Sequence, residues 1–418
     1  MATRDLVHPR DAILRAIERI YRYRMTTTSG GNLSIRDDDG STWITPARVD
    51  KGGLRREDIV HILPDGNADG PHPPSSEWPF HRAIYEARPD LRGIVHAHPV
   101  ALVAFSVAGR VPETRALAQA RRICGTVGYA PYALPGSIAL GRNIAVAFAD
   151  GPDCVVLENH GVVTAGPTIQ RAFERFETLE FAAKTIIKAS HLGEVRYLDE
   201  ATIERKFAQS PDAPSFDPDQ PSSVEKELRR QLCEFVGRAY RQRLMISTEG
   251  AFSARLDAET FLVTPHGRDR AELEPADLVL VRGGRVESGK VPSTSHRDHR
   301  AIYEAEADVR SIINAYPVNA TAFSLTDVPL DARTIPESYL LLRDVGRDPS
   351  SSVTLRRPAR LLPNDGVQVC GTSVLDAFDR LEVLESTAEA LLNSRPLGPM
   401  LPMSDRAIAD LNEAFGLD

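Results

Sequence analysis

The chain has 418 residues, which is long enough for two or three domains. Apolar residues make up 42% of it and charged residues 26%, as in an ordinary globular protein, so disorder over the whole chain is excluded. The 50 basic and 58 acidic side chains give a net charge of −8, which argues against a general nucleic-acid binder because such proteins need a basic surface.

The N-terminal stretch is charged and amphipathic from its first residues and lacks the apolar core of a signal peptide. The four cysteines lie far apart and form no C-x-x-C pair, which favours a reducing compartment over a disulfide framework. No apolar stretch is long enough to cross a bilayer. We therefore expect a cytoplasmic protein that binds neither a membrane nor a nucleic acid.

In chain order, the first half of the sequence alternates between helical and extended patterns. Apolar periodicity predicts helices at 11–24, 77–87, 101–107 and 171–189, and strands at 43–45, 93–98, 155–157 and 162–164. Alternation of this kind is typical of a central sheet covered by helices.

A repeat relates the two halves of the chain. The segment 75–106 aligns without gaps with 293–324, and 17 of the 32 positions are identical, where about two would be expected by chance. The motif LENHGVV at 157–163 likewise matches LPNDGVQ at 362–368. The sequence therefore predicts a tandem duplication.

The proline-rich segment between the copies marks the domain boundary, because such sequence resists packing into a core. We predict a first domain at 1–207, a linker at 208–223, a second domain at 224–394 and a C-terminal tail at 395–418. A short helix with Ser404 as its N-cap is expected within the tail.

Two histidines in the first half suggest a metal site. His96 and His98 lie two residues apart in the predicted strand GIVHAHPV, so both imidazoles leave the same face. His160, in the turn ENHGV, could supply a third ligand, and Glu77, at a helix start, could supply a carboxylate. The alternative is that such histidines are ordinary surface or packing residues.

The second half supports the metal interpretation. Four positions differ together between the copies, in a similar surrounding sequence: Glu77, His96, His98 and His160 become Ser295, Asn314, Tyr316 and Asp365. Scattered drift is unlikely to select that set. We therefore predict an intact metal site in the first domain and a degenerate second domain that lacks metal ligands.

Six motifs of the first half occur in the order and at the spacing of one family: SGGNLS (29–34), ITP (44–46), SSEWPFH (75–81), HAHP (96–99), APY (130–132) and NHG (159–161). On these motifs the chain resembles the class II, zinc-dependent aldolase and adducin head family, typified by L-fuculose-1-phosphate aldolase and L-ribulose-5-phosphate 4-epimerase. The resemblance implies an α/β fold of three layers, α/β/α, with a central mixed or antiparallel sheet, duplicated in tandem.

The resemblance also implies roles for individual residues. His96, His98 and His160 would hold Zn²⁺, or another divalent metal such as Mn²⁺, Co²⁺ or Fe²⁺. Glu77 would be the acid or base beside the metal, and Tyr132 a proton donor that reaches a neighbouring subunit's site. Tyr132 could instead be ordinary loop packing.

A cradle for the substrate phosphate is implied by the same resemblance. The matching positions are Gly31, Asn32, Ser75 and Ser76, although these could also form a plain turn and a helix N-cap. Family members usually continue the Thr-Pro pair with Ser/Thr-Gly, whereas this chain has Ala47 and Arg48. Arg48 could bind a phosphate or a carboxylate, or lie on the surface, so the sequence leaves open whether the substrate is phosphorylated.

The function expected from these observations is a metal-dependent aldehyde-lyase. It would catalyse reversible aldol cleavage of a small sugar or sugar-phosphate-like hydroxy-carbonyl compound through a metal-bound enediolate. The same site would also suit an epimerase, decarboxylase or dehydratase, and a non-catalytic, adducin-like scaffold is a further alternative. The resemblance to ring-forming proteins predicts a homo-oligomer, either a dimer that forms a pseudo-fourfold ring or a tetramer.

Overall fold

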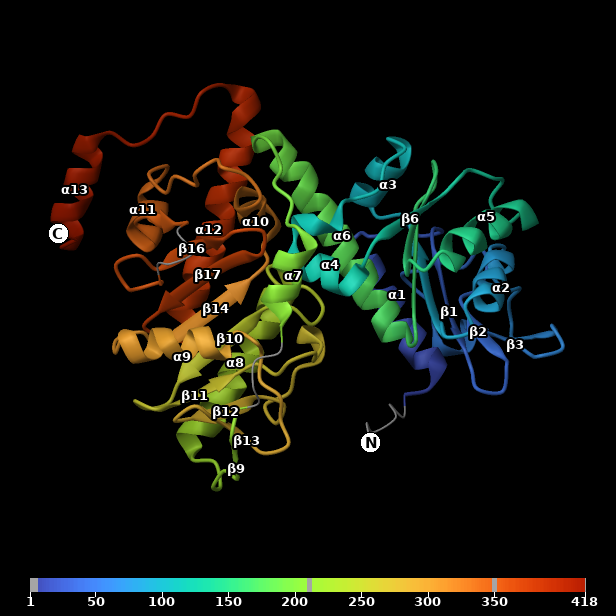
Figure 1. Cartoon of the computed structure of the whole chain (residues 1–418), viewed down its shortest axis with the longest axis horizontal. Helices are drawn as coiled ribbons and strands as arrows, with labels where there is room; N and C mark the ends of the chain where they lie inside the picture. The colour runs from blue at the N-terminus through green and yellow to red at the C-terminus, as the bar shows by residue number, and fades with distance from the viewer. Residues whose placement is uncertain (1–6, 209–212, 348–351, 418) are drawn as a thin grey trace. The chain divides into compact units, whose positions relative to one another are not determined.

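The computed structural model describes residues 7–208, 213–347 and 352–417 (Figure 1). The chain divides into two compact units, one of residues 1–115 with 120–184 and one of residues 116–119 with 185–418. Of the linker predicted at 208–223, residues 209–212 lie outside the described residues, and Ser215–Phe216 form strand β9.

The first unit is a mixed α/β structure. Its strands are β1 (Asn32–Arg36), β2 (Thr42–Ile44), β3 (Val60–Ile62), β4 (Ala68–Asp69), β5 (Gly93–Ala97), β6 (Val127–Ala130), β7 (Cys154–Leu157) and β8 (Val162–Gly166). The helices along this stretch of chain are α1 (Pro9–Arg22), α2 (Trp78–Ala87), α3 (Val100–Val107), α4 (Ala118–Cys124), α5 (Ile138–Ala149) and α6 (Ile169–Leu192), with short 3₁₀ turns η1 (Arg56–Asp58) and η2 (Thr114–Ala116).

The eight strands form one sheet in the order β4-β3-β2-β1-β5-β8-β7-β6. Neighbouring strands are antiparallel except for the parallel pair β6 and β7. The register places Asn32 of β1 opposite His96 of β5. Two residues of the predicted site therefore lie side by side in the middle of the sheet.

Helices cover both faces of this sheet. Buried apolar residues of α2 and α5, such as Phe80 and Ile144, pack with Ile94 and Val163 on one face. Figure 1 shows α1 and α6 on the opposite side of the strands. This arrangement is the three-layer α/β/α fold that the resemblance implied.

The second unit has the same plan. Its strands are β9 (Ser215–Phe216), β10 (Ala251–Arg255), β11 (Thr260–Val263), β12 (Val279–Arg282), β13 (Arg285–Glu287), β14 (Ser311–Ala315), β15 (Val345–Gly346), β16 (Ala359–Leu362) and β17 (Gly366–Gly371). Its helices are α7 (Glu200–Phe207), α8 (Ser223–Arg241), α9 (His296–Ala305), α10 (Val318–Ser324), α11 (Pro336–Leu342), α12 (Val374–Ser394) and α13 (Asp405–Phe415), with 3₁₀ turns η3 (Arg270–Glu272) and η4 (Arg395–Leu397).

The strand order of the second sheet is β15-β16-β17-β14-β10-β11-β12-β13-β9. Strand by strand this repeats the first sheet, with β9 added at one edge. The register is also repeated, because Ala251 lies opposite Asn314 just as Asn32 lies opposite His96. Two sheets with one topology fit a duplication.

The element boundaries follow local sequence signals. Helix α1 begins after His8, whose ring accepts a hydrogen bond from the Arg10 amide, and it buries Ile13, Ile17 and Ile20 on one face. Strand β5 ends at Ala97, one residue before the predicted end, because Pro99 lacks an amide hydrogen and caps α3. In the tail, α13 begins after Ser404, whose hydroxyl accepts from the Ala407 amide, as the sequence predicted.

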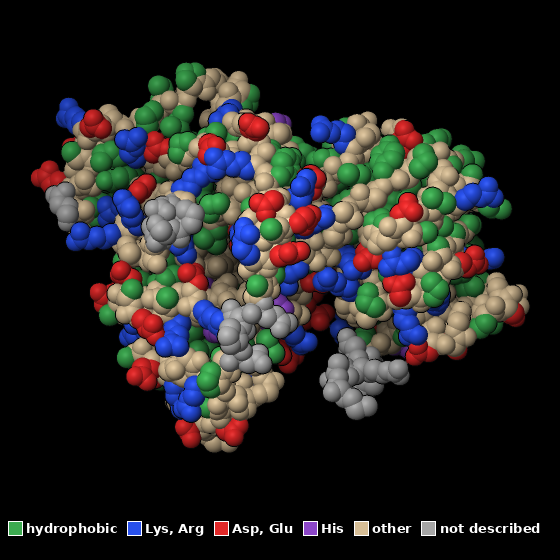
Figure 2. Space-filling model, in the orientation of Figure 1, with side chains coloured by type: hydrophobic (Ala, Val, Ile, Leu, Met, Phe, Trp, Pro, Cys, Tyr) green, Lys and Arg blue, Asp and Glu red, His purple; other side chains and the backbone are tan. Residues whose placement is uncertain are grey.

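On the face shown in Figure 2, acidic and basic side chains are interspersed over both units, as the near balance of charges predicts. Within the part of the chain that the structure describes, none of the helices has both the length and the apolar character needed to traverse a bilayer.

Candidate metal centre

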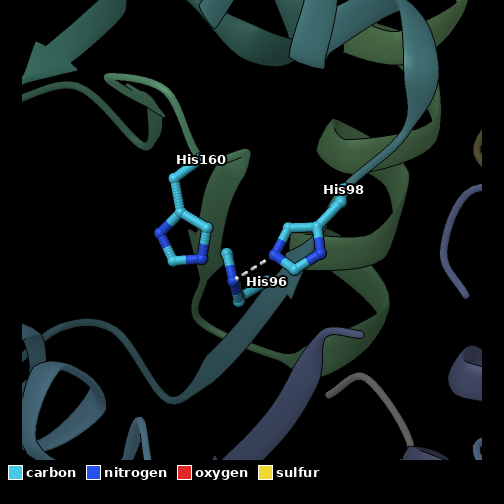
Figure 3. Close-up of side chains that lie close together, drawn as sticks. All are labelled: His96, His98 and His160. Carbon is cyan, nitrogen blue, oxygen red and sulfur yellow. Dashed lines mark hydrogen bonds between the residues drawn. The ribbon is translucent and has the colours of Figure 1, made fainter. Parts of the chain in front are cut away.

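Three imidazoles of the first unit converge. His96 is on β5, His98 directly follows that strand, and His160 lies in the turn between β7 and β8 (Figure 3). One ring nitrogen from each histidine lies within 4.8 Å of the other two, and the Nε2 atoms of His96 and His98 are 3.1 Å apart. No other group of this kind occurs among the described residues.

Glycines allow the backbone to approach this cluster. Gly31 has φ 75°, and a Cβ atom there would lie 2.7 Å from the carbonyl oxygen of His96. A Cβ atom on Gly161 would lie 2.6 Å from both the Ala97 carbonyl oxygen and the His98 ring. Side chains at these two positions would therefore push the histidine-bearing segments apart.

The orientation of His96 is fixed by the neighbouring strand. Its Nδ1 lies 2.9 Å from the carbonyl oxygen of Val162, which can only accept, so Nδ1 carries the hydrogen. The other ring nitrogen, Nε2, then points its lone pair into the cluster. A backbone acceptor that sets the tautomer in this way is usual for metal-binding histidines.

Glu77 completes the cluster from the N-cap position of α2. Its Oε2 lies 3.2 Å from His96 Nε2 and accepts a 2.7 Å hydrogen bond from Asn32 Nδ2. Its Oε1 lies 3.5 Å from His160 Nε2, is buried, and has no hydrogen-bond partner. Asn32 thus holds Oε2, which also faces His96, while Oε1 faces His160.

Burial and mutual repulsion keep two of the imidazoles neutral. Burial, together with the nearby His96 and His160, lowers the pKa of His98 to about 3, and burial with His96 lowers the pKa of His160 to about 4. Burial alone would raise the pKa of Glu77, but the adjoining imidazoles of His96 and His160 and the hydrogen bond from Asn32 outweigh it and hold that pKa well below its usual range. Glu77 is therefore ionised at neutral pH.

These residues fit a divalent metal. Neutral imidazoles and an ionised carboxylate all direct lone pairs at one small region, and such an arrangement is favourable only when a cation occupies it. The unpartnered Glu77 Oε1 points to the same need. Three imidazoles with a carboxylate beside them are a common ligand set for catalytic zinc.

Three loops beside the cluster are tied together. The Ser75 amide donates to the Thr45 carbonyl at 3.2 Å, and the Lys51 amide donates to the Thr28 carbonyl at 2.9 Å. The buried Lys51 ammonium donates to the carbonyls of Pro46 and Val49 at 3.0 and 3.4 Å, and burial lowers its pKa to about 8. The loops that carry the predicted anion-binding residues therefore adjoin one another.

The predicted anion-binding residues differ in exposure. Gly31, Asn32 and Ser75 are buried, whereas Ser76 and Arg48 are exposed. The Asn32 amide is directed at Glu77 rather than outward.

Tyr132 lies on the surface of the first unit. It lies in the loop between β6 and α5, is 57% exposed, and donates its backbone amide to Glu158 Oε2 at 2.8 Å. No contact of its side chain with the three histidines is found within the described chain. Its role in a neighbouring subunit's site stays a prediction.

Sequence reasoning missed a buried network behind Glu77. His81, Ser34 and Tyr85 are linked by hydrogen bonds of 2.7 Å. All three are unchanged in the second copy, as His299, Ser253 and Tyr303. The repeat contains this identity, but identity between the copies indicates duplication and does not by itself reveal hydrogen bonds.

The model of the Class II Aldolase and Adducin N-terminal domain matches residues 11–187 and 230–392. The chain belongs to this family. Two matched segments agree with the two repeated sheets.

The curated relatives match about one copy of the repeat. The 5-methylthioribulose-1-phosphate/5-deoxyribulose-1-phosphate aldolase of Rhodospirillum rubrum is 30% identical over 196 residues, which are 47% of this chain and 88% of that protein. The L-fuculose phosphate aldolase of Methanococcus maripaludis is 32% identical over 165 residues, 40% of this chain and 88% of the relative. The 3-oxo-tetronate 4-phosphate decarboxylase of Haemophilus influenzae is 30% identical over 189 residues, which are 44% of this chain and 89% of that protein.

Among solved structures, an L-fuculose 1-phosphate aldolase aligns with a TM-score of 0.44 and 29% identity, covering 50% of this chain and 99% of that one. YgbL of Escherichia coli, described as a putative aldolase/epimerase/decarboxylase, aligns with a TM-score of 0.44 and 28% identity. The alignment covers 47% of this chain and 96% of YgbL.

Proposed function

We propose that the first unit is a metal-dependent lyase that cleaves and forms a carbon–carbon bond of a small hydroxy-carbonyl substrate by aldol chemistry. The observation that carries the proposal is the convergence of His96, His98 and His160 with an ionised Glu77 beside them. Family membership and two relatives named as aldolases support the reaction class.

The three histidines would hold the metal, with Zn²⁺ as the first choice and Mn²⁺, Co²⁺ or Fe²⁺ as alternatives. When bound, the metal would act as a Lewis acid for substrate oxygens and stabilise negative charge that develops on them. Glu77 would move a proton to or from the substrate through Oε1, because Oε2 is held by Asn32.

The loops beside the cluster support a substrate with an anionic group. The hydroxyls of Ser75 and Ser76 and the backbone at Gly31 and Asn32 are small donors of the kind that bind phosphate, whereas the Asn32 side chain is engaged with Glu77. Arg48 adds an exposed guanidinium, which binds phosphate or carboxylate through paired hydrogen bonds. Both named aldolase relatives act on phosphorylated compounds by their names.

Arg48 has a backbone conformation that favours glycine. Its φ is 58°, and the equivalent residue of the second unit is Gly267, with φ 65°. An arginine in this region costs about 1 kcal/mol relative to an unstrained residue. A guanidinium kept at such a position is consistent with a role in binding the substrate anion.

Decarboxylation is the second candidate, because the 3-oxo-tetronate 4-phosphate decarboxylase matches as well as the aldolases do. Both reactions develop negative charge next to a carbonyl and need the same cation. A decarboxylase would use Arg48 for a carboxylate and would not need a group such as Tyr132, which in aldol chemistry would take the hydroxyl proton as the aldehyde departs and return it in the reverse direction.

The exposure of Tyr132 also bears on how copies of the chain assemble around the small-molecule substrate. A tyrosine that is 57% exposed could reach the site of another copy. We infer a homo-oligomer, as a pseudo-fourfold dimer or a tetramer, with this residue near the neighbouring site.

The proposal is tested by elemental analysis combined with product analysis. The purified protein, loaded with Zn²⁺, Mn²⁺, Co²⁺ or Fe²⁺, is given phosphorylated and unphosphorylated ketoses, aldol-type hydroxy acids and β-keto acids. Aldehyde release that depends on metal supports the lyase. Release of CO₂ without aldehyde favours the decarboxylase, and turnover that survives complete metal removal contradicts both.

A further inference from the structure

A buried chain of hydrogen bonds lies behind Glu77 and reaches it through Asn32. Tyr85 Oη lies 2.7 Å from Ser34 Oγ, which lies 2.7 Å from His81 Nδ1. His81 Nε2 contacts Asn32 Oδ1, and Asn32 Nδ2 donates to Glu77 Oε2 at 2.7 Å. We call these four residues, Tyr85, Ser34, His81 and Asn32, the relay.

The chemistry of the groups fixes the direction of every bond. Asn32 Oδ1 can only accept, so His81 Nε2 carries a hydrogen and donates it. Burial lowers the pKa of His81 to about 3, so the ring is neutral and its Nδ1 is an acceptor. Ser34 must then donate to Nδ1, and its oxygen accepts from the Tyr85 hydroxyl.

This direction decides how the Asn32 amide lies. Because the oxygen of Asn32 is held by His81, its nitrogen must face Glu77. The opposite orientation would place the amide oxygen against the carboxylate, where two acceptors repel. The amide is 3% exposed, so water has little access to replace a lost partner. The relay therefore holds Glu77 Oε2 and leaves Oε1 beside His160 without a hydrogen-bond partner.

The second unit provides an internal comparison. Tyr303, Ser253 and His299 repeat the first three members, with distances of 2.7 and 2.8 Å. His299 Nε2 then contacts Asn314 Oδ1 at 2.9 Å. Asn314 occupies the position of His96, and the position of Asn32 is Ala251. The tyrosine, serine and histidine of the relay thus occur in both units. Only in the first unit does the asparagine that follows them in the chain of hydrogen bonds donate to a carboxylate.

We propose that His81 is a positioning residue: as the neutral Nε2–H tautomer, it orients the Asn32 amide so that Asn32 presents the Glu77 carboxylate to the reacting atoms. The proposal rests on the proposed function for its effect on turnover, although the tautomer and the orientation do not depend on any reaction.

The test compares His81→Leu with His299→Leu, which removes the equivalent ring from the second unit. Each should lower the melting temperature by a similar amount, because each removes a ring that hydrogen-bonds to one buried serine and one buried asparagine. Only His81→Leu should lower kcat further, by about 10- to 100-fold, with KM within about twofold and metal content unchanged. His81→Gln, whose amide can still donate to Asn32, should recover most of the loss in kcat.

Two measurements do not require turnover. Nitrogen NMR of the ¹⁵N-histidine-labelled full chain should show one resonance, absent from His81→Gln, with a protonated Nε2 and an unprotonated Nδ1. A crystal structure of His81→Leu should show the Glu77 carboxylate displaced from its wild-type position.

Equal kcat losses in His81→Leu and His299→Leu, a protonated Nδ1, or an unmoved Glu77 would each overturn the proposal. If the wild-type protein cleaves no substrate on the panel, the proposed function fails while the tautomer and the position of Glu77 still decide this inference. If His81→Leu does not fold, Ser34→Ala and Ser253→Ala carry the same comparison, with a smaller loss of kcat expected only for Ser34→Ala.

Discussion

The same place in the two sheets holds a metal-ready cluster in one unit and a hydrogen-bonded polar network in the other. In the second unit Asn314 donates to Ser295 Oγ at 3.3 Å, and Gln368 donates to Asn314 Oδ1 at 2.9 Å. Tyr316 donates to Asp365 at 3.1 Å. The second copy replaced the cluster with polar groups that hydrogen-bond to one another, although the buried Gln368 Oε1 has no partner.

A second pair of positions differs in charge balance. Glu180 of α6 accepts from the Leu102 amide at the start of α3, and Lys184 pairs with it at 3.1 Å. Glu385 of α12 accepts from the amides of Asn319 and Ala320 at the start of α10. The residue equivalent to Lys184 is Glu389, so Glu385 has no compensating charge one turn away. Burial, and to a lesser extent Glu389, raises the pKa of Glu385 to about 7.

The largest difference between the units should appear in Glu77→Gln and its counterpart Ser295→Ala. Glu77→Gln keeps the shape but removes the proton-carrying group, so kcat should fall by about 10²- to 10⁴-fold while metal content stays near that of the wild type. Ser295→Ala should change neither quantity. Steady-state assays with parallel elemental analysis decide this, and a fully active Glu77→Gln protein would remove Glu77 from the mechanism.

The charge difference on the long helices predicts pH responses of different size, because burial raises the pKa of both Glu385 and Glu180 but Lys184 opposes the shift at Glu180. The pKa of Glu385 is raised from 4.5 to about 7 in the folded state. Between these two pH values, the folded state therefore binds more protons than the unfolded state. Its contribution to stability is complete below about pH 4.5 and is lost as the pH rises through 7, by up to about 3 kcal/mol. Glu385→Gln should remove this slope in urea unfolding at pH 5 to 8.

Glu180→Gln is the matched control for Glu385→Gln. Because Lys184 already compensates Glu180, this substitution should change the pH slope less and should leave the lysine without its partner. Identical slopes for both variants would show that Glu389 and Lys184 do not cause the difference.

A smaller, symmetrical effect is expected at the ends of the polar networks. Tyr85→Phe and Tyr303→Phe each remove one buried hydroxyl that contacts a serine at 2.7 Å. Each should lower the free energy of unfolding by about 1 kcal/mol, measured by urea denaturation. A loss confined to one variant would contradict the structural equivalence of the two units.

The smallest effect on stability should come from the left-handed position that is Arg48 in one unit and Gly267 in the other. Arg48→Gly should raise stability slightly, by less than about 1 kcal/mol, because it relieves a positive φ. The same change should raise KM for an anionic substrate several-fold. Unchanged KM would exclude Arg48 from substrate binding.

Much of this arrangement could be predicted from sequence. The two-residue spacing of His96 and His98 placed both rings on one face, because strands alternate, and the repeat predicted two sheets of one topology. The register that sets Asn32 beside His96 could not be predicted, since pairing between strands distant in sequence depends on the whole sheet. The direction of the Asn32 amide depends on three further buried residues. From the sequence alone, Asn32 is therefore recognised only as a residue that could bind an anion.

The most direct test of the central claim is the number of metal ions that each chain binds. Chelator-treated protein is reloaded with Zn²⁺, desalted and measured by mass spectrometry of the metal. The account predicts one zinc per chain in the wild type, none in His96→Ala and one in Asn314→Ala. Two ions per wild-type chain, or full occupancy in His96→Ala, would contradict it.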